Sequence, residues 1–211
     1  SAVILMKGLF ITFEGIDGSG KTTQIKLLAD FLVKKGHNVV VTREPGGTPI
    51  GDKIRDILLD PSNRGMSVRA ETLLFEASRA EIVDKVIRPA LGEGKVVICD
   101  RFFDSTSAYQ GTARGLGADK ILDLSLWATD GLVPDITFLL SADRSLCGIR
   151  LKTRKKTPDR IEFEEDGFKK KLQDGYIELA GSFPGRIVVV NGEQEIKTIF
   201  EIIKNRIKEL L

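Results

Sequence analysis

The strongest chemical signal in the chain is a glycine-rich run, Gly15–Thr22 (GIDGSGKT), that matches the pattern G-x-x-x-x-G-K-[ST] at every fixed position. Glycines at this spacing let backbone N–H groups converge on phosphate oxygens, and a helix that starts directly after them adds the positive end of its dipole. In such a loop the lysine, here Lys21, reaches the β and γ phosphates, and the hydroxyl of Thr22 is a ligand for Mg²⁺. The run therefore predicts a site for a nucleoside triphosphate.

A second signal is the pair Asp100 and Arg101 at the end of an apolar run. A carboxylate in that place is typical of the magnesium site of a phosphate-loop enzyme, which makes Asp100 a candidate metal residue beside Thr22. Arg101 would project into the same cleft, where its guanidinium can bind a phosphate through two hydrogen bonds. The alternative for Asp100 is a residue that caps a turn at a strand end.

Phe75 and Arg79 form a third candidate pair, because residues four apart lie on one face of a helix. A ring beside a planar donor can stack on a base and hydrogen-bond its edge. Taken alone the pair is weak evidence, since phenylalanine on a helix mostly packs in a core and arginine is mostly solvated. It is a candidate base site only in combination with the phosphate loop.

These residues need a framework, and the periodicity of apolar residues predicts one. Short apolar, β-branched runs indicate buried strands, and apolar residues three and four apart indicate helices. Strands that are apolar on both sides and alternate with helices predict an α/β fold: a five-stranded parallel sheet with helices on both faces. Ligands of such sheets bind at the carboxyl ends of the strands. The predicted strands cover 8–14, 37–43, 95–100, 134–141 and 186–191, and the helices 21–35, 48–59, 68–91 and 194–211, with Pro61 and Pro89 at helix ends.

Composition restricts the function classes. The 32 Lys and Arg residues nearly balance the 30 Asp and Glu residues, so the charge pattern gives no support for a protein that coats nucleic acid or a membrane. A single histidine, His37, excludes histidine-rich metal sites, and the isolated Cys99 and Cys147 support neither a zinc knuckle nor a disulfide framework. No apolar run approaches the roughly 20 residues that span a bilayer. We expect a cytoplasmic protein with a single domain over 6–211, after an extension, 1–5, that is foreign or disordered.

Taken together, the motifs resemble those of bacterial thymidylate kinases. The resemblance runs from residue 8 to about 165, and R-E-P-G-G-T and D-R-x-x-x-S…A-Y-Q-G are far more specific than the phosphate loop, which many families share. It implies the fold of the phosphate-loop nucleoside monophosphate kinases, ATP and dTMP as substrates, Mg²⁺ as cofactor, and a homodimer. The matching pieces are 13–23 (FEGIDGSGKTT), 42–48 (TREPGGT), 74–79 (LFEASR), 100–105 (DRFFDS), 108–111 (AYQG) and 159–162 (DRIE).

The resemblance also implies a role for each candidate residue. Phe75 would stack on thymine, and Arg79 would hydrogen-bond its edge. Arg55 and Arg101 would hold the phosphate of dTMP, and Tyr109 would leave no room for a 2′-hydroxyl. The implied ATP-binding residues are Gly15, Asp17, Gly18, Ser19, Gly20, Lys21, Thr22 and Thr23. The implied dTMP-binding residues are Asp17, Arg55, Phe75, Arg79, Arg101, Ser105, Thr106 and Tyr109.

A small mobile lid over about 150–165 is the last implied feature. This stretch (RLKTRKKTPDRIEFEE) is dense in charge and poor in core residues, so we predict an exposed loop between two helices. Asp17 places an acid beside the expected triphosphate. The resemblance explains it: in the bacterial branch of the family this loop position is acidic and binds the 3′-hydroxyl of the acceptor sugar. In that branch the catalytic arginine comes from the lid. The alternative is a solvated basic loop. The lid candidates are Arg150, Arg154 and Arg160, with Lys155 and Lys156 beside them, and the catalytic candidates are Lys21, Arg101, Arg150 and Arg154.

The implied reaction moves the γ-phosphoryl group of ATP to dTMP and gives dTDP and ADP, on the route to dTTP. A phosphate monoester is an anion at neutral pH, since its second pKa is about 6, so no strong general base is needed. This agrees with the lack of a positioned histidine. Catalysis would consist of positioning and charge neutralisation, with lid closure to exclude water.

Two alternatives stay open. A nucleotide-dependent switch would not require a monophosphate acceptor; the Asn-Lys-x-Asp motif by which GTPases read guanine is absent from the sequence. A kinase for another nucleoside monophosphate or for a deoxynucleoside would share the phosphate loop. A nucleoside acceptor, however, would leave Arg55 and Arg101 without an anion, so a panel of acceptors separates these cases.

Overall fold

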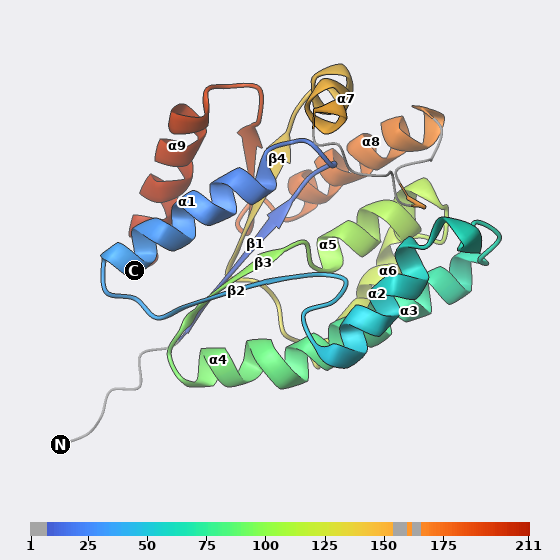
Figure 1. Cartoon of the computed structure of the whole chain (residues 1–211), viewed down its shortest axis with the longest axis horizontal. Coiled ribbons are helices and arrows are strands. Elements are labelled where there is room, and N and C mark those ends of the chain that lie inside the picture. The colour runs from blue at the N-terminus through green and yellow to red at the C-terminus, as the bar shows by residue number, and fades with distance from the viewer. Residues whose placement is uncertain (1–7, 154–159, 162–165) are drawn as a thin grey trace.

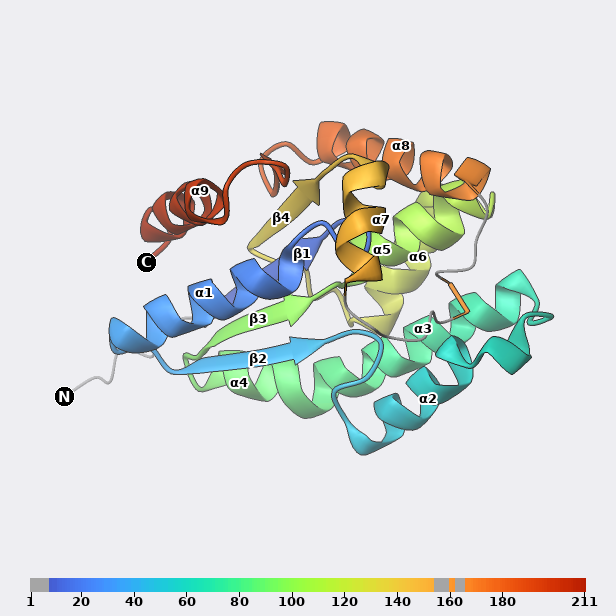
Figure 2. The same ribbon diagram turned by 45° about the horizontal axis from the view of Figure 1, so that its top comes forward.

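The computed structural model describes residues 8–153, 160–161 and 166–211. These residues form the five-stranded parallel sheet that the sequence predicts, and its strand order is β2-β3-β1-β4-β5. In Figure 2 the arrows of β2, β3, β1 and β4 all point toward the same end of the molecule. The strands are β1 (Leu9–Glu14), β2 (Val39–Arg43), β3 (Val96–Asp100), β4 (Ile136–Ser141) and β5 (Ile187–Asn191).

The helices alternate with the strands, and the four helical segments with predicted bounds, 21–35, 48–59, 68–91 and 194–211, are observed with closely similar bounds. The α-helices are α1 (Lys21–Lys34), α2 (Pro49–Leu59), α3 (Val68–Ile82), α4 (Arg88–Gly92), α5 (Phe103–Thr106), α6 (Ala118–Ala128), α7 (Arg144–Lys152), α8 (Asp166–Ser182) and α9 (Ile196–Lys208). Shorter pieces are the 3₁₀-helix η1 (Pro61–Asn63) and the π-helices η2 (Val83–Ile87) and η3 (Ser107–Ala113).

Pro89 does not mark a helix end, which corrects one detail of the prediction. The predicted helix 68–91 is observed as α3, η2 and α4 in direct succession, and Pro89 lies in the first turn of α4. Proline has no N–H to donate to the preceding turn and is tolerated at a helix start. The wider π-helical turn directly before α4 lets the chain continue past it.

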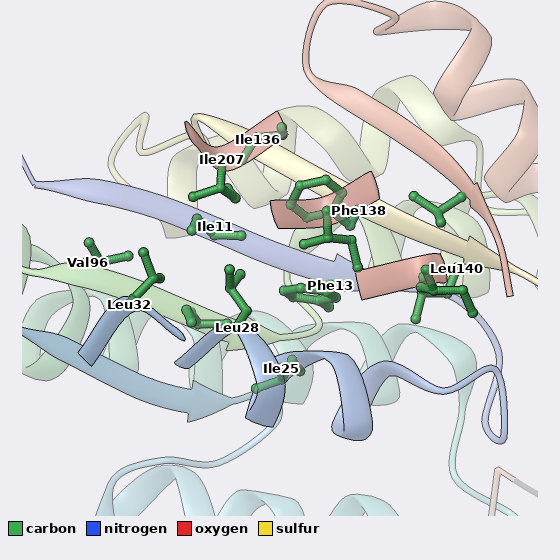
Figure 3. Close-up of a cluster of buried hydrophobic side chains, with 14 residues drawn as sticks. Ile11, Phe13, Ile25, Leu28, Leu32, Val96, Ile136, Phe138, Leu140 and Ile207 are labelled. Atoms are coloured by element: carbon green, nitrogen blue, oxygen red, sulfur yellow. The ribbon is translucent and has the colours of Figure 1, made fainter. Parts of the chain in front are cut away.

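One face of the sheet is covered by α1 and α9 (Figure 1). Alternate residues of a strand point to opposite faces, so Ile11 and Phe13 of β1 point to this side and Phe10 to the other. Figure 3 shows Ile11 and Phe13 among side chains of the helices, including Leu28 of α1 and Ile207 of α9.

The opposite face is covered by the α3–η2–α4 run and by α8. Phe10 and Val97 pack there against Ile82 and Ile87, and Leu139 of β4 packs in a separate cluster with residues of α8 and η3. The three central strands, β1, β3 and β4, are buried on both faces, which explains why their sequences are mostly apolar. The two helical layers leave the carboxyl ends of the strands free to carry the site.

Candidate active site

A cavity of about 530 Å³ lies at the carboxyl ends of β1, β2 and β3. Its lining includes residues within three positions of the end of each of these strands, namely Asp17, Glu44 and Arg101. The predicted site residues that line it are Asp17, Gly18, Gly20, Lys21, Thr22, Arg55, Phe75, Arg79, Asp100, Arg101, Ser105, Thr106 and Tyr109. Four predicted residues, Gly15, Ser19, Thr23 and Arg150, belong to adjoining segments but not to the lining among the described residues, and Arg154 lies outside those residues.

The phosphate loop is closely packed from two sides, which explains two of its glycines. A Cβ at Gly15 would lie 2.4 Å from the carbonyl oxygen of Leu140, and one at Gly18 would lie 2.5 Å from that of Cys147 in α7. Inside the loop, Lys21 Nζ donates to the Gly15 carbonyl at 2.8 Å. Burial lowers the pKa of Lys21 below its ordinary value, and the neighbouring charge of Arg101 adds to this effect. Backbone carbonyls thus hold the lysine within the loop.

Arg101 joins the loop to the far side of the cavity. Its backbone has φ = 72°, a left-handed conformation that non-glycine residues rarely adopt, and its N–H donates to Phe13 O at 2.9 Å. The guanidinium forms an ion pair with Asp17 at 2.7 Å. Its other donor group is bonded to Ser105 Oγ at 3.2 Å and to Tyr176 Oη at 3.1 Å. Backbone strain of this kind is typical of functional positions.

Glu14, directly before the phosphate loop, supports the same region and was not predicted. Its carboxylate is 1% exposed and accepts hydrogen bonds from Phe102 N at 2.7 Å, Ser105 Oγ at 2.5 Å and Tyr176 Oη at 3.0 Å. Burial, helped by the charge of Asp104, raises the pKa of Glu14 to about 7. The sequence signal for Glu14 is an acid in an otherwise apolar strand; for Tyr176, which comes from α8, no local signal exists.

Arg79 is almost completely buried, with 1% of its surface exposed. Its guanidinium is bonded to Glu44 at 2.7 Å, to Glu76 at 2.8 Å and to Thr106 Oγ1 at 2.9 Å. Burial raises the pKa of Glu44 to about 7 even though Arg79 opposes the shift. The two carboxylates fix the orientation of the guanidinium at the cavity wall. The sequence prediction included Arg79 and Thr106 but missed both carboxylates.

The remaining predicted acceptor residues come from α2, α3 and η3. Arg55 of α2 donates to the Pro45 carbonyl at 2.8 Å, which ties α2 to the turn after β2. The Tyr109 ring lies 5.5 Å from the centre of the Arg101 guanidinium, and Phe75 exposes part of its ring to the cavity. One end of the cavity therefore presents rings and planar donors, and the other end presents the phosphate loop.

The predicted lid residues separate into three groups. Arg150, at the end of α7, donates to the carbonyls of Gly18 at 3.3 Å and Gly192 at 3.1 Å, beside the phosphate loop. Arg160 is 5% exposed and paired with Glu71 at 2.5 Å, so the expectation that it belongs to an exposed loop as a free lid cation is wrong. The reason is a buried carboxylate from α3 that the linear sequence did not place there. Arg154, Lys155 and Lys156 lie outside the described residues.

The predicted metal residues suit Mg²⁺. Asp100 Oδ1 is buried and has no hydrogen-bond partner, and Thr22 lines the same cavity. In the described part of the chain, no group of three or more His, Cys, Asp and Glu side chains could hold a metal by itself. Mg²⁺ needs no such group, because it commonly keeps its waters and binds one or two protein oxygens together with substrate phosphates.

Comparison with known proteins gives one consistent family. Residues 13–203 match the thymidylate kinase family. A thymidylate kinase of Thermoanaerobacter sp. (strain X514) is 47% identical over 207 residues, covering 98% of this chain and 100% of the relative. One from Caldanaerobacter subterraneus subsp. tengcongensis is 46% identical over 206 residues, covering 98% of each. The crystal structure of thymidylate kinase from Ehrlichia chaffeensis is 37% identical, covers 95% of this chain and 98% of its own, and superimposes with a TM-score of 0.77.

Proposed function

The chain belongs to the thymidylate kinase family, and from this premise we propose which of its residues carry out the reaction. It is an enzyme that phosphorylates dTMP to dTDP with ATP. The proposal rests on one observation: a single cavity is lined both by the phosphate loop and by the Phe75–Arg79 pair, which we assign to its donor end and its acceptor end. Two nucleotides could therefore lie in it with their phosphates facing each other.

At the donor end, the backbone N–H groups of the loop and the Lys21 ammonium would bind the ATP phosphates. Asp100 and Thr22 would hold Mg²⁺, which supplies positive charge to the phosphates when bound. The unpartnered Asp100 Oδ1 supports this assignment. Gly15, Ser19 and Thr23 would contribute through the loop backbone and the first turn of α1.

At the acceptor end, Phe75 would stack on the thymine and Arg79 would donate to its edge. The two carboxylates at 2.7 Å and 2.8 Å from Arg79 leave its orientation fixed before the base arrives. Tyr109 would pack under the deoxyribose. Thr106 and Ser105 lie at the same wall, and their hydroxyls already accept from Arg79 and Arg101, so they would act by holding those arginines.

Arg101 and Asp17 would lie between the two nucleotides. Their ion pair of 2.7 Å places a cation and an anion at the point where the acceptor phosphate and the sugar 3′-hydroxyl would bind. We propose that Arg101, with Arg55, takes the phosphate and that Asp17 accepts from the 3′-hydroxyl. Since the acceptor phosphate is already anionic, the protein need only neutralise two polyanions and hold them in line.

We further propose one domain over 6–211, with a lid over about 150–165 that carries the catalytic arginine. Arg150 is supported by its position beside the Gly18 carbonyl, and Arg154 by its spacing of four from Arg150. Arg160 is not included, because its charge is already paired with Glu71.

The enzyme would act as a homodimer. Trp127 of α6 is 80% exposed and Leu73 of α3 is 58% exposed, and these two helices pack against each other. Large apolar side chains on neighbouring exposed helices are typical of an interface. Light scattering should give a dimer for the unmodified chain and a monomer for Trp127→Glu. Val33→Glu, at an apolar site on α1 that is 59% exposed, should stay dimeric; a monomeric unmodified chain would contradict the proposal.

We also place the enzyme in the cytoplasm, where ATP and dTMP are available. Cys99 and Cys147 are buried free thiols, which agrees with a reducing compartment. None of the described helices combines the length and the apolar character needed to cross a membrane.

A panel of acceptors tests the assignment of the cavity. With ATP and Mg²⁺, dTMP should be phosphorylated much faster than UMP, and thymidine should not react because it offers no anion to Arg55 and Arg101. Equal rates with UMP would contradict the role of Tyr109. Release of ADP without any acceptor, at the full rate, would favour a nucleotide-dependent switch instead.

A further inference from the structure

A buried carboxylate outside the cavity joins several segments of the acceptor end. Glu71, in the first turn of α3, is 1% exposed. Its Oε1 accepts from Gln110 Nε2 at 2.8 Å and from Arg114 Nε at 3.2 Å, both in or next to η3. Its Oε2 lies 2.5 Å from Arg160 Nη2. One side chain of α3 is therefore bonded to η3 and to the chain at residue 160.

Arg160 extends these contacts to α2. Its backbone N–H donates to Leu59 O at 3.1 Å, and its Nε donates to Leu58 O at 2.7 Å. Carbonyls in the last turn of a helix have no partner within the helix, so Arg160 supplies donors that the end of α2 needs. Figure 2 shows the short orange piece at 160–161 beside the ends of α2 and α3. Arg160 thus connects the end of α2 with the start of α3.

Every segment that meets at this pair also carries part of the cavity wall. Arg55 and Leu59 come from α2, Tyr109 from η3, and Ile161 directly follows Arg160. On α3, Glu71 lies four residues before Phe75, so the two side chains share a face of the helix. Glu71 and Arg160 themselves are not among the described residues that line the cavity.

The charges of the cluster hold it together firmly. Burial alone would raise the pKa of Glu71, but the hydrogen bond from Gln110 and the charges of Arg114 and Arg160 bring it below its ordinary value. Two guanidinium groups share one carboxylate in a site with almost no water, where an unpaired charge is strongly unfavourable. The contacts are therefore expected to persist in every substrate-bound state.

We propose that Glu71 and Arg160 are positioning residues for the acceptor nucleotide: their buried pair fixes the spacing of α2, α3 and Ile161 and so sets the affinity for dTMP. This inference rests on the proposed placement of dTMP between Phe75 and Arg55. Arginine is required, because one nitrogen of its planar fork donates to the Leu58 carbonyl while another is ion-paired with Glu71, whereas a lysine has one nitrogen to offer. None of these contacts involves a residue of the phosphate loop, so ATP binding should be independent of the pair.

Calorimetric titration and steady-state kinetics of Arg160→Met test the proposal. We expect the Kd and the KM for dTMP to rise about 10-fold to 100-fold, the range that follows from a displacement of about 1 Å. The Kd for ATP and the kcat at saturating dTMP should stay near those of the unmodified enzyme. Arg69→Met is the matched control, because Arg69 is exposed in the same first turn of α3; it should change neither constant.

Arg160→Lys keeps the charge and decides the matter if Arg160→Met does not fold; its Kd for dTMP should rise while its Kd for ATP does not. A folded Arg160 variant that binds dTMP normally would overturn the inference. So would an equal loss of affinity for ATP and dTMP, which would indicate a general loss of structure. If the unmodified enzyme does not bind dTMP at all, the proposed site fails first, and the variants are then not needed to reject the inference.

Discussion

The two ends of the cavity are constructed in different ways. The donor end comes from one short run, Gly15–Thr22, in which Lys21 is held by the Gly15 carbonyl. The acceptor end collects side chains from positions as distant as Arg43 and Ile161. A phosphate has the same shape in every nucleotide and can be bound by backbone N–H groups, whereas one base is told from another by side chains in a fixed arrangement.

The helix starts at the two ends show the same contrast. At the donor end, α1 begins after Gly20 without a side chain that caps it, so its first N–H groups remain available to a phosphate. At the acceptor end, α2 begins after Thr48, whose Oγ1 accepts from Gly51 N at 2.9 Å. The donor end leaves the start of its helix uncapped for the ligand, whereas the acceptor end caps the start of its helix internally.

The largest effect should follow from Lys21→Ala at the donor end. Loss of the charge that meets the transferred phosphoryl group should lower kcat by about 10³-fold, which corresponds to about 4 kcal/mol. The melting temperature should change little, because the bonds of Lys21 go to backbone carbonyls. Lys26→Ala, on an exposed face of α1, is the control and should keep full activity. A normal kcat for Lys21→Ala would remove the lysine from the mechanism.

Arg79→Met should affect stability as well as binding, which distinguishes the acceptor end. The change leaves Glu44 and Glu76 buried without their cation, so the free energy of unfolding should fall by about 3–5 kcal/mol. The KM for dTMP should rise more than that for ATP. Urea denaturation and kinetics measure the two effects.

A triple variant separates these effects. Arg79→Met combined with Glu44→Gln and Glu76→Gln removes the unpaired charges, so it should recover most of the stability but not the affinity for dTMP. Recovery of dTMP binding by the triple variant would show that Arg79 does not contact the base. A greater loss of ATP affinity than of dTMP affinity would place Arg79 at the donor end.

Glu14, between the two ends, should make stability depend on pH. Its pKa rises from 4.5 to about 7 on folding, so the folded chain binds this proton more tightly than the unfolded chain. The contribution of protonated Glu14 to the free energy of unfolding is fully present below pH 4.5 and is lost as the pH rises through about 7. The loss is of the order of 3 kcal/mol.

The comparison of unfolding free energies between pH 5 and pH 8 isolates this group. Glu14→Gln should match the unmodified protein near pH 5 and become the more stable of the two at pH 8. Glu195→Gln, at an exposed carboxylate, should leave the pH dependence as it was. An identical pH dependence for Glu14→Gln and the unmodified protein would show that Glu14 is ionised throughout.

The smallest effect should come from Thr48→Ala, which removes the cap of α2. The free energy of unfolding should fall by about 1 kcal/mol, since one helix N–H loses its partner. The KM for dTMP should change slightly through Arg55, and the KM for ATP should not change. Thermal denaturation and kinetics detect both. A change in the KM for ATP alone would contradict the assignment of α2 to the acceptor end.

The sequence was most informative where the structure depends on residues that are close together along the chain. The periodicity of apolar residues predicted every strand to within two residues of its observed start, and the phosphate loop could be recognised because its chemistry resides in consecutive positions. The prediction that a helix ends at Pro89 was wrong because the π-helical turn before this residue has no local sequence signature. Phe75 and Arg79 were found only because a motif of known relatives marked them.

The partners of the buried charges could not be predicted in the same way. The residues around Arg160 have the composition of an exposed loop, and only the folded chain shows that Glu71 lies next to the Arg160 guanidinium. The same holds for Tyr176, which reaches Glu14 and Arg101 from α8.

What the sequence determined by itself was the sheet and the loop that binds phosphates, since each depends on short patterns of hydrophobicity or on contiguous residues; the reaction class came from the resemblance to a known family. Tertiary structure alone decided which charges are available to substrates and which are used to hold the helices, because an ion pair such as Glu71–Arg160 joins residues far apart in the chain. Desolvation makes such pairing close to obligatory once both groups are buried, and burial is a property of the packed molecule.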